Sequence, residues 1–228
     1  MSALTLHAVH KTRGSGRHRV NVIREVSFAV APGEVVLLRG PSGSGKTTLL
    51  ALAAGLLTAD RGRIVLDGSE LGVLTRSALR KLRSRRIGFV FQRASLLSRL
   101  SARENIEMMG RLAGLPAADS SRASAGLLEQ LSLTHVAGNL PRELSVGEEM
   151  RVAVARALIH RPAIVLADEP TANLDGALGS EVARCLADAA LSRGAAVLVA
   201  THDPRLESLA SRTLQLVDGA LVGEGAPL

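Results

Sequence analysis

The sequence predicts an α/β fold built on a mainly parallel sheet, and three observations support this prediction. Short runs rich in β-branched residues alternate with longer segments of helical periodicity, as in successive βα units. Three of these runs are almost wholly apolar, as expected for strands that helices cover on both faces. A length of 228 residues, with 46 % apolar and 21 % charged residues, suits one compact unit with a substantial core.

The apolar runs give the expected strands in order. Residues 4–9 and 20–30 alternate between apolar and polar side chains and predict an antiparallel β piece near the N-terminus, which Pro32 and Gly33 end. The strands of the parallel sheet are then expected at residues 35–38, 86–91, 163–167 and 195–200.

The middle of the chain follows a different pattern. Helical periodicity covers residues 102–112 and 120–131, a turn at residues 114–116 separates them, and no convincing strand lies between residues 101 and 140. We therefore expect a helical subdomain inserted into the α/β core. The predicted organisation is a single domain over residues 1–228, with its core at about 1–95 and 150–228 and the helical subdomain at about 96–149.

Composition argues against several classes of protein. The longest apolar run, residues 49–57, is far shorter than the roughly 18–20 residues of a membrane-spanning helix. The N-terminus lacks the basic start and apolar stretch of a secretory signal, so we expect a cytoplasmic chain. Cys185 is the only cysteine, which excludes an internal disulfide and a multi-cysteine zinc site.

Net charge is less decisive. The chain carries a formal charge of +7, which can serve nucleic acid, anionic lipid or phosphate ligands, or can reflect only the base composition of the genome. Phe28, Phe89 and Phe91 are its only aromatic residues, so it lacks the stacking platform of single-strand and RNA binders. No nucleic-acid partner is expected.

A glycine-rich loop with one lysine follows the strand at 35–38 and precedes a helix predicted at 48–54. Its sequence, Gly-Pro-Ser-Gly-Ser-Gly-Lys-Thr, matches the phosphate-binding loop pattern. Backbone N–H groups and the helix N-terminus would surround the β-phosphate, Lys46 would reach the β and γ oxygens, and Thr47 would ligate Mg²⁺. The nucleotide-binding residues predicted here are Gly40, Pro41, Ser42, Gly43, Ser44, Gly45, Lys46, Thr47 and Thr48.

Two further strands end in polar residues at the same edge of the predicted sheet. The strand at 163–167 is followed by Asp168, suited to organising Mg²⁺, and by Glu169, which could polarise the attacking water. The strand ending at residue 200 is followed by His202, where a γ-phosphate would lie. The predicted catalytic residues are Lys46, Glu169 and His202.

The order of the motifs resembles that of the ATPase subunits of ABC transporters over essentially the whole chain. After the phosphate loop come Gln92, the Leu-Ser-Val-Gly-Glu run at 144–148, Asp168-Glu169, the Asn-Leu-Asp run at 173–175, and His202. The Leu-Ser-x-Gly signature upstream of the Asp-Glu strand separates this family from other phosphate-loop enzymes. Runs such as IGFVFQ, RVAVARAL, LADEPTANLD and ASRTLQLVDG look most similar to subunits that serve lipoprotein-releasing, macrolide-export and cell-division permeases.

The resemblance implies a shared active site. Two subunits, identical or paralogous, would sandwich two ATP molecules with Mg²⁺, and each nucleotide would meet the partner's signature residues Ser145, Val146, Gly147 and Glu148. Asp175 would communicate across the interface. Gln92, a nucleotide- and Mg²⁺-contacting residue, would link the site to an integral membrane permease, whose cytoplasmic helix would enter a groove between the segment after Gln92 and the helical subdomain. The subunit would be peripheral on the cytoplasmic face of the membrane.

Some positions depart from the family pattern or carry a second interpretation. The family commonly has an adenine-stacking aromatic residue near position 12 or 13, where this chain offers the guanidinium of Arg13. Val146 replaces a glycine of the signature. Ser145 and Glu148 also form the pattern of a helix capping box, which is compatible with an anion site at the same helix N-terminus. The six basic residues between positions 76 and 86 are interpreted as a solvated helix face.

The sequence leaves two alternative functions open. One is an ABC-type ATPase acting on nucleic acid or ribosomes, although such proteins usually carry two ATPase modules or long insertions. The other is a regulatory module that binds ATP with little turnover. A neighbouring reading frame for a four-helix permease with a large extracytoplasmic domain would favour the transport subunit.

Overall fold

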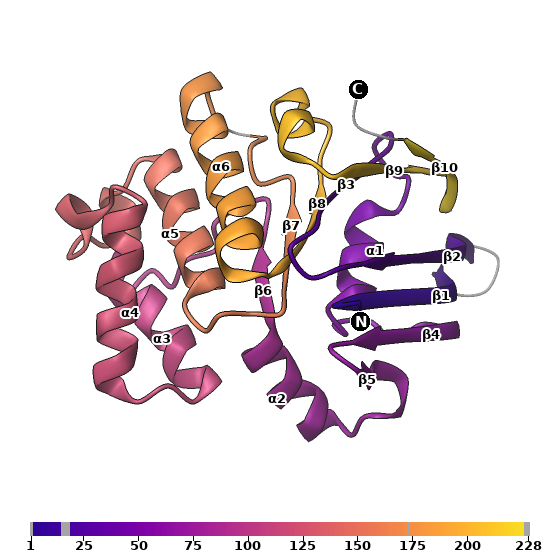
Figure 1. Cartoon of the computed structure of the whole chain (residues 1–228), viewed down its shortest axis with the longest axis horizontal. Helices are drawn as coiled ribbons and strands as arrows, with labels where there is room; N and C mark the ends of the chain where they lie inside the picture. The colour runs from indigo at the N-terminus through magenta and orange to yellow at the C-terminus, as the bar shows by residue number, and fades with distance from the viewer. Residues whose placement is uncertain (1, 15–18, 173, 226–228) are drawn as a thin grey trace.

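The computed structural model describes residues 2–14, 19–172 and 174–225, and it contains two sheets (Figure 1). The larger sheet has the strand order β10-β9-β3-β8-β7-β6, in which all neighbours pair in parallel except β9 and β10. The strands are β3 (Val35–Arg39), β6 (Ile87–Val90), β7 (Ile164–Asp168), β8 (Ala196–Ala200), β9 (Arg212–Val217) and β10 (Ala220–Gly225). The predicted α/β class with a mainly parallel sheet is confirmed.

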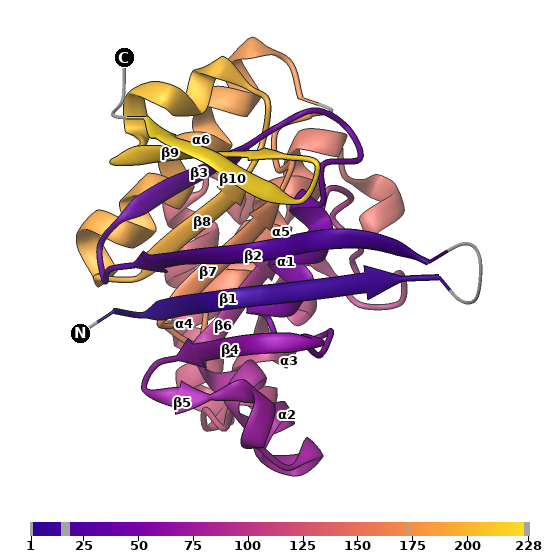
Figure 2. The same ribbon diagram turned by 90° about the vertical axis from the view of Figure 1, so that its right-hand side faces the viewer.

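The smaller sheet is the antiparallel piece predicted at the N-terminus, with the strand order β2-β1-β4-β5 (Figure 2). Its strands are β1 (Leu4–Arg13), β2 (Val20–Val30), β4 (Arg61–Leu66) and β5 (Ser69–Glu70). The sequence pattern did not predict β4, β5, β9 or β10, and β1 extends beyond the predicted residues 4–9. The additional residues of β1 also pair with β2, although the register shifts along the pair. Lys11 lies opposite Ile23, and Arg13 lies opposite Val20.

Helix α1 (Lys46–Ala53) lies between the two sheets. Its fully buried Leu49, Leu50 and Leu52 belong to one hydrophobic cluster with Leu4 of the smaller sheet and Leu38 of the larger one. The helix begins at Lys46, two residues earlier than predicted, because Gly45 takes a left-handed conformation (φ 106°) at its N-cap. The phosphate loop is thereby held at the point where both sheets meet the helix.

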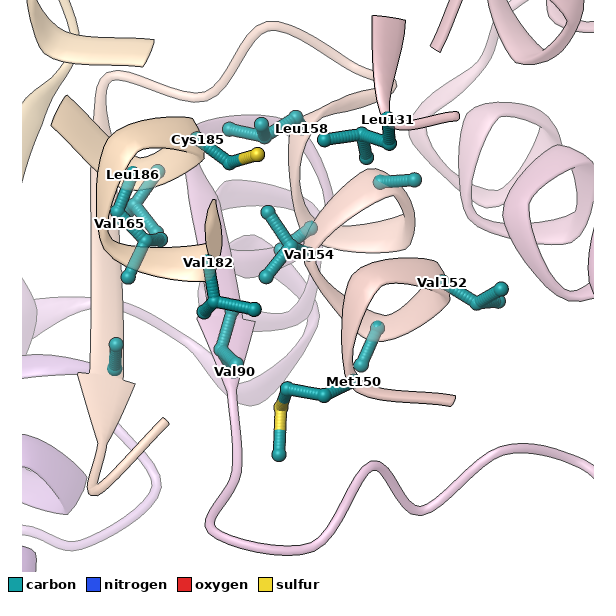
Figure 3. Close-up of a cluster of buried hydrophobic side chains, with 14 of the residues drawn as sticks. Val90, Leu131, Met150, Val152, Val154, Leu158, Val165, Val182, Cys185 and Leu186 are labelled. Atoms are coloured by element: carbon teal, nitrogen blue, oxygen red, sulfur yellow. The ribbon is translucent and has the colours of Figure 1, made fainter. Parts of the chain in front are cut away.

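Helices α5 (Val146–Leu158) and α6 (Gly176–Arg193) pack on the opposite face of the larger sheet. Helices α3 (Ala102–Ala113) and α4 (Ala117–Gln130) pack against α5, with short 3₁₀ turns at Thr134–Val136 and Pro141–Glu143 (Figure 1). A second hydrophobic cluster joins them to the sheet, and Figure 3 shows Val154 of α5 near Val182 of α6 and Val90 of β6. Residues 101–140 form no strand, as predicted. Helix α4 starts three residues before the predicted position because Pro116 serves as its N-cap.

Helix α2 (Arg76–Arg86) carries the basic run and buries none of its residues. The basic run is therefore exposed or half-buried along the whole helix, as the interpretation of a solvated helix face requires. Arg83 donates a hydrogen bond to the backbone oxygen of Gly55, and Arg86 pairs with Asp67 at 2.5 Å. Within the described ranges, no helix is both long and apolar enough to cross a membrane.

Candidate active site

The glycine-rich loop curls between β3 and α1. A side chain at Gly40 (φ 153°) would overlap the backbone oxygen of Leu216, so the loop requires glycine there. The Lys46 ammonium lies inside the loop, where Nζ donates hydrogen bonds to the backbone oxygens of Gly40 (2.7 Å) and Pro41 (3.1 Å). The loop therefore holds one cation at its centre, close to the N-terminal end of α1.

Asp168, at the end of β7, meets the start of α1. Thr47 Oγ1 donates a hydrogen bond of 2.8 Å to Asp168 Oδ2. Burial raises the pKa of Asp168, while the hydrogen bond from Thr47 and the charge of Lys46 act in the opposite direction. A hydroxyl and a carboxylate side by side are the hard oxygen donors that Mg²⁺ prefers, so these two residues fit the predicted metal site.

Glu169 lies next to His202, at the sheet edge where the sequence predicted both residues. His202 Nδ1 is 2.9 Å from Glu169 Oε1, and Glu169 Oε2 is buried without a hydrogen-bond partner among the described residues. The Glu169 backbone has φ 47°, a conformation that costs energy for a residue with a side chain and that clusters at functional sites. Its N–H donates to the backbone oxygen of Ala200 at 2.8 Å, which fixes the loop beside β8.

These groups surround one cavity of about 700 Å³. Every predicted nucleotide-binding residue except Ser44 contributes to its lining, and so do the predicted catalytic and metal-ligating residues. Ser44 lies buried under the loop, only 3 % exposed. Val22 of β2, which no sequence motif marked as a site residue, also lines the cavity, and its backbone oxygen approaches Gly45. The lining residues are Arg13, Val22, Gly40, Pro41, Ser42, Gly43, Gly45, Lys46, Thr47, Thr48, Gln92, Asp168, Glu169 and His202.

The signature residues lie away from this cavity, and none of them contributes to its lining. Ser145 is the N-cap of α5, and Glu148 Oε2 accepts hydrogen bonds of 2.8 Å from both Ser145 N and Ser145 Oγ. The predicted capping box is therefore present. Val146 is 58 % exposed, and a side chain at Gly147 would come within 2.6 Å of Leu178 Cδ1 on α6.

Asp175 also lies outside the cavity lining, at the start of α6. Its Oδ1 accepts a hydrogen bond of 3.0 Å from Leu178 N, so it caps the first turn of that helix. Leu174 packs partly buried against the helical core cluster. Asn173, the first residue of the predicted Asn-Leu-Asp motif, lies outside the described residues.

A second cavity, of about 420 Å³, lies between α2, β6, α3 and α5, and we call it the apolar groove. It contains Phe89 and Phe91, two of the three aromatic residues of the chain, with ring centroids 4.3 Å apart. Arg156 of α5 closes one wall by donating hydrogen bonds to the backbone oxygens of Ala94 (2.7 Å) and Ser95 (2.8 Å). The other lining residues include Leu56, Arg80, Arg83, Leu97, Met108, Met109 and His160.

The fold and the main cavity define the class of this protein: a phosphate-loop ATPase in which strand-end carboxylates and a histidine face the loop. Comparison with known proteins then gives the family. The profile of the ABC transporter family matches residues 23–172, which is more than half of the chain. The chain therefore belongs to the ABC transporter family and is an ATPase of the ABC type.

Individual relatives agree with this assignment. The chain is 41 % identical over 219 residues to the ABC transporter ATP-binding protein YbbA of Escherichia coli K12, with 96 % of each chain covered. It is 39 % identical over 223 residues to the lipoprotein-releasing system ATP-binding protein LolD of Geobacter metallireducens, covering 98 % of this chain and 99 % of LolD. It is 37 % identical to the macrolide export ATP-binding/permease protein MacB of Neisseria gonorrhoeae, of which it spans only 35 %. The resemblance to this subfamily is confirmed.

A solved structure shows the same architecture. MJ0796, a bacterial ABC transporter cassette described as dimeric and bound to ADP and phosphate after hydrolysis, superimposes with a TM-score of 0.91 at 32 % identity over 99 % of both chains. The ABC-type fold predicted from the motifs is therefore confirmed.

Proposed function

We propose that this chain is the ATP-hydrolysing subunit that drives a separate integral membrane permease from the cytoplasmic face of the membrane. Two copies, or one copy and a paralogous subunit, would close on two Mg-ATP molecules. The observation that carries this proposal is the separation within one chain between the cavity and the signature residues at the exposed start of α5. A second chain supplies the missing half of each site.

The roles of the cavity residues follow from their geometry. Lys46 exchanges its bonds to two loop carbonyls for bonds to phosphate oxygens, which are stronger because both partners are charged. Thr47, Asp168 and Gln92 would hold Mg²⁺, which neutralises phosphate charge when bound.

Glu169 is suited to act as the base toward water. Its buried Oε2 has no partner among the described residues and can accept a proton, while His202 orients the carboxylate through Oε1. His202 is itself 75 % exposed at the side chain, so it can contact a phosphate oxygen at the mouth of the cavity.

The part of the cavity that would bind adenine differs most from the pattern that is usual in the family. Arg13 at the end of β1 and Val22 of β2 line the cavity on the side of the smaller sheet. A guanidinium plane can stack on a base, and the apolar Val22 offers a second contact. Arg13 would thus take the place of the aromatic residue that is usual in the family.

The apolar groove supports the permease as the partner. Aromatic and methionine side chains are enriched at the buried centres of protein interfaces, and here two Phe and two Met residues share one hollow. Phe91 is 42 % exposed and directly precedes Gln92 in the chain. An amphipathic helix of a permease seated in this groove would therefore act on the nucleotide site through Gln92.

The decisive experiment compares two variants by size-exclusion chromatography with saturating Mg-ATP. Glu169→Gln should bind ATP and form a stable dimer, because binding is kept while hydrolysis is blocked. Lys46→Ala should bind no nucleotide and stay monomeric, and Lys81→Ala on the exposed face of α2 is the matched control for loss of a lysine. A monomeric Glu169→Gln protein that still binds ATP would contradict the shared site.

A further inference from the structure

The Arg205 side chain lies between the loop that carries His202 and the loop that follows Glu169. Arg205 belongs to the 3₁₀ segment η5 (Pro204–Leu209). Its Nε donates to both carboxylate oxygens of Asp203, at 2.9 and 2.8 Å, and its Nη2 lies 2.6 Å from Asp203 Oδ2. The guanidinium is therefore fixed as a fork on the residue next to His202.

The other side of the same guanidinium reaches the second loop. Nη1 donates a hydrogen bond of 2.6 Å to the backbone oxygen of Asp175, and Nη2 donates one of 3.4 Å to the backbone oxygen of Thr171. Thr171 Oγ1 in turn donates to Asp203 Oδ2 at 2.5 Å. The planar Arg205 guanidinium thus forms hydrogen bonds with two loops that are about 30 residues apart in sequence.

The surroundings are shaped for this side chain. A side chain at Gly179 on α6 would collide with the Arg205 guanidinium, so the glycine leaves the space that the fork occupies. Asp203 and Thr171 are buried, at 8 % and 1 % exposure. Burial acts to raise the pKa of Asp203, but the hydrogen bonds from Arg205 and Thr171 outweigh it and lower the pKa to about 2. Asp203 is therefore a carboxylate at neutral pH.

We propose that Arg205 is a positioning residue that couples the interface loop at Asp175 to the catalytic loop at His202. This inference rests on the proposed function, because it assumes that Asp175 faces the partner subunit. Contact of the partner with Asp175 would then be transmitted through one rigid guanidinium to Asp203 and to the adjacent His202. A lysine would keep the charge beside Asp203 but has no second arm for Asp175, because its ammonium is a single point charge.

The test uses the Glu169→Gln chain as background and measures its dimer dissociation constant by sedimentation at saturating Mg-ATP. Arg205→Lys should raise that constant about tenfold, equivalent to about 1.4 kcal/mol, while the ATP affinity of the dilute monomer changes less than about twofold. Arg205→Ala should give a larger rise. Glu207→Gln is the matched control, because it removes the ion pair with Arg39 from the same 3₁₀ segment without touching either loop.

Three outcomes contradict the proposal, each in a different way. Equal dissociation constants for Arg205→Lys and Glu207→Gln would show that the fork does not couple the loops. A matching loss of ATP affinity in the Arg205→Lys monomer would show general loosening instead of positioning. A Glu169→Gln background that stays monomeric would overturn the proposed function and the coupling together. In otherwise wild-type chains, Arg205→Lys should lower kcat about tenfold, and Glu207→Gln should not.

Discussion

His202 Nδ1 lies 2.9 Å from Glu169 Oε1, although the two residues follow different strands and are separated by 33 positions in the chain. The contact exists because β7 and β8 are parallel neighbours, with Asp168 in register with Ala200, so both loops leave the sheet at the same edge. The contact leaves Oε2 as the carboxylate oxygen without a hydrogen-bond partner among the described residues, the one to which the proposed function assigns the proton from water. The orientation of this one carboxylate therefore depends on the pairing of two central strands.

Replacing His202 should impair hydrolysis more than nucleotide binding. His202→Ala removes the contact to Glu169 Oε1 and the group that, in the proposed function, meets the terminal phosphate, so we expect kcat to fall on the order of 10²-fold, the lower end of general acid–base effects. Single-turnover hydrolysis and equilibrium ATP binding, measured on the same preparation, separate the two steps. His7→Ala, on the exposed part of β1, is the control. An equal loss of affinity would assign His202 to ground-state binding.

Asp203 should make the folded chain sensitive to acid. Its pKa is about 2 in the folded state against 3.8 for a free side chain, so it stabilises the fold above pH 3.8 and this contribution is lost as pH falls toward 2. The shift corresponds to about 2 kcal/mol. In urea titrations, Asp203→Asn should therefore lose less free energy of unfolding between pH 4 and pH 2 than the wild type. Asp119→Asn, at an exposed ion pair on α4, should keep the wild-type slope.

The strands that the sequence predicted are those that can be recognised from their own residues, without knowledge of the strands they pair with. β3, β7 and β8 consist of almost uninterrupted apolar residues because helices or the smaller sheet cover both faces, and each was found within one residue of its start. β4 was not predicted because Arg61, Gly62 and Arg63 are exposed, so half of the strand has no hydrophobic pattern. Its strand state comes from pairing with β1, where Arg63 lies opposite His7, and no local pattern encodes that partner.

The residues of the candidate site divide in the same way, into those that a local motif predicts and those that only the fold brings to the site. The phosphate loop and the strand-end acids are contiguous motifs whose chemistry can be inferred from spacing, and the structure gathers them around one cavity. Val22 and Arg205 belong to no contiguous motif from which a role could be inferred. Val22 belongs to an alternating strand and reaches the cavity only because the smaller sheet packs beside the loop. Arg205 meets Thr171 across 34 residues, and Gly179 makes room for it from a third segment.

The apolar groove should be required for the permease partner. Leu97→Asp replaces an apolar side chain of the groove that is 45 % exposed with a carboxylate, which is costly to bury against the apolar face of a permease helix. We expect loss of co-purification with the permease and of its stimulation of ATP hydrolysis, while ATP affinity of the isolated subunit reports on folding. Leu112→Asp, at a 60 % exposed position of α3 that is not part of the groove lining, is the matched control. Equal retention of the permease by both variants would place its docking surface elsewhere.

Val146 is the side chain most particular to this signature, and replacing it with glycine should raise turnover. It is the first residue of α5 and is 58 % exposed, so its branched side chain points away from its own chain, whereas the neighbouring Gly147 lies close under Leu178. In the proposed dimer, the valine would limit the approach of the α5 N–H groups to the partner's phosphate. Val146→Gly should therefore increase ATPase activity several-fold, on the order of 1 kcal/mol of transition-state stabilisation, when measured together with the permease. Val146→Ala, which keeps helix propensity better than glycine, should give a smaller increase. Unchanged or lower turnover in both variants would mean that the closed dimer accommodates valine without cost.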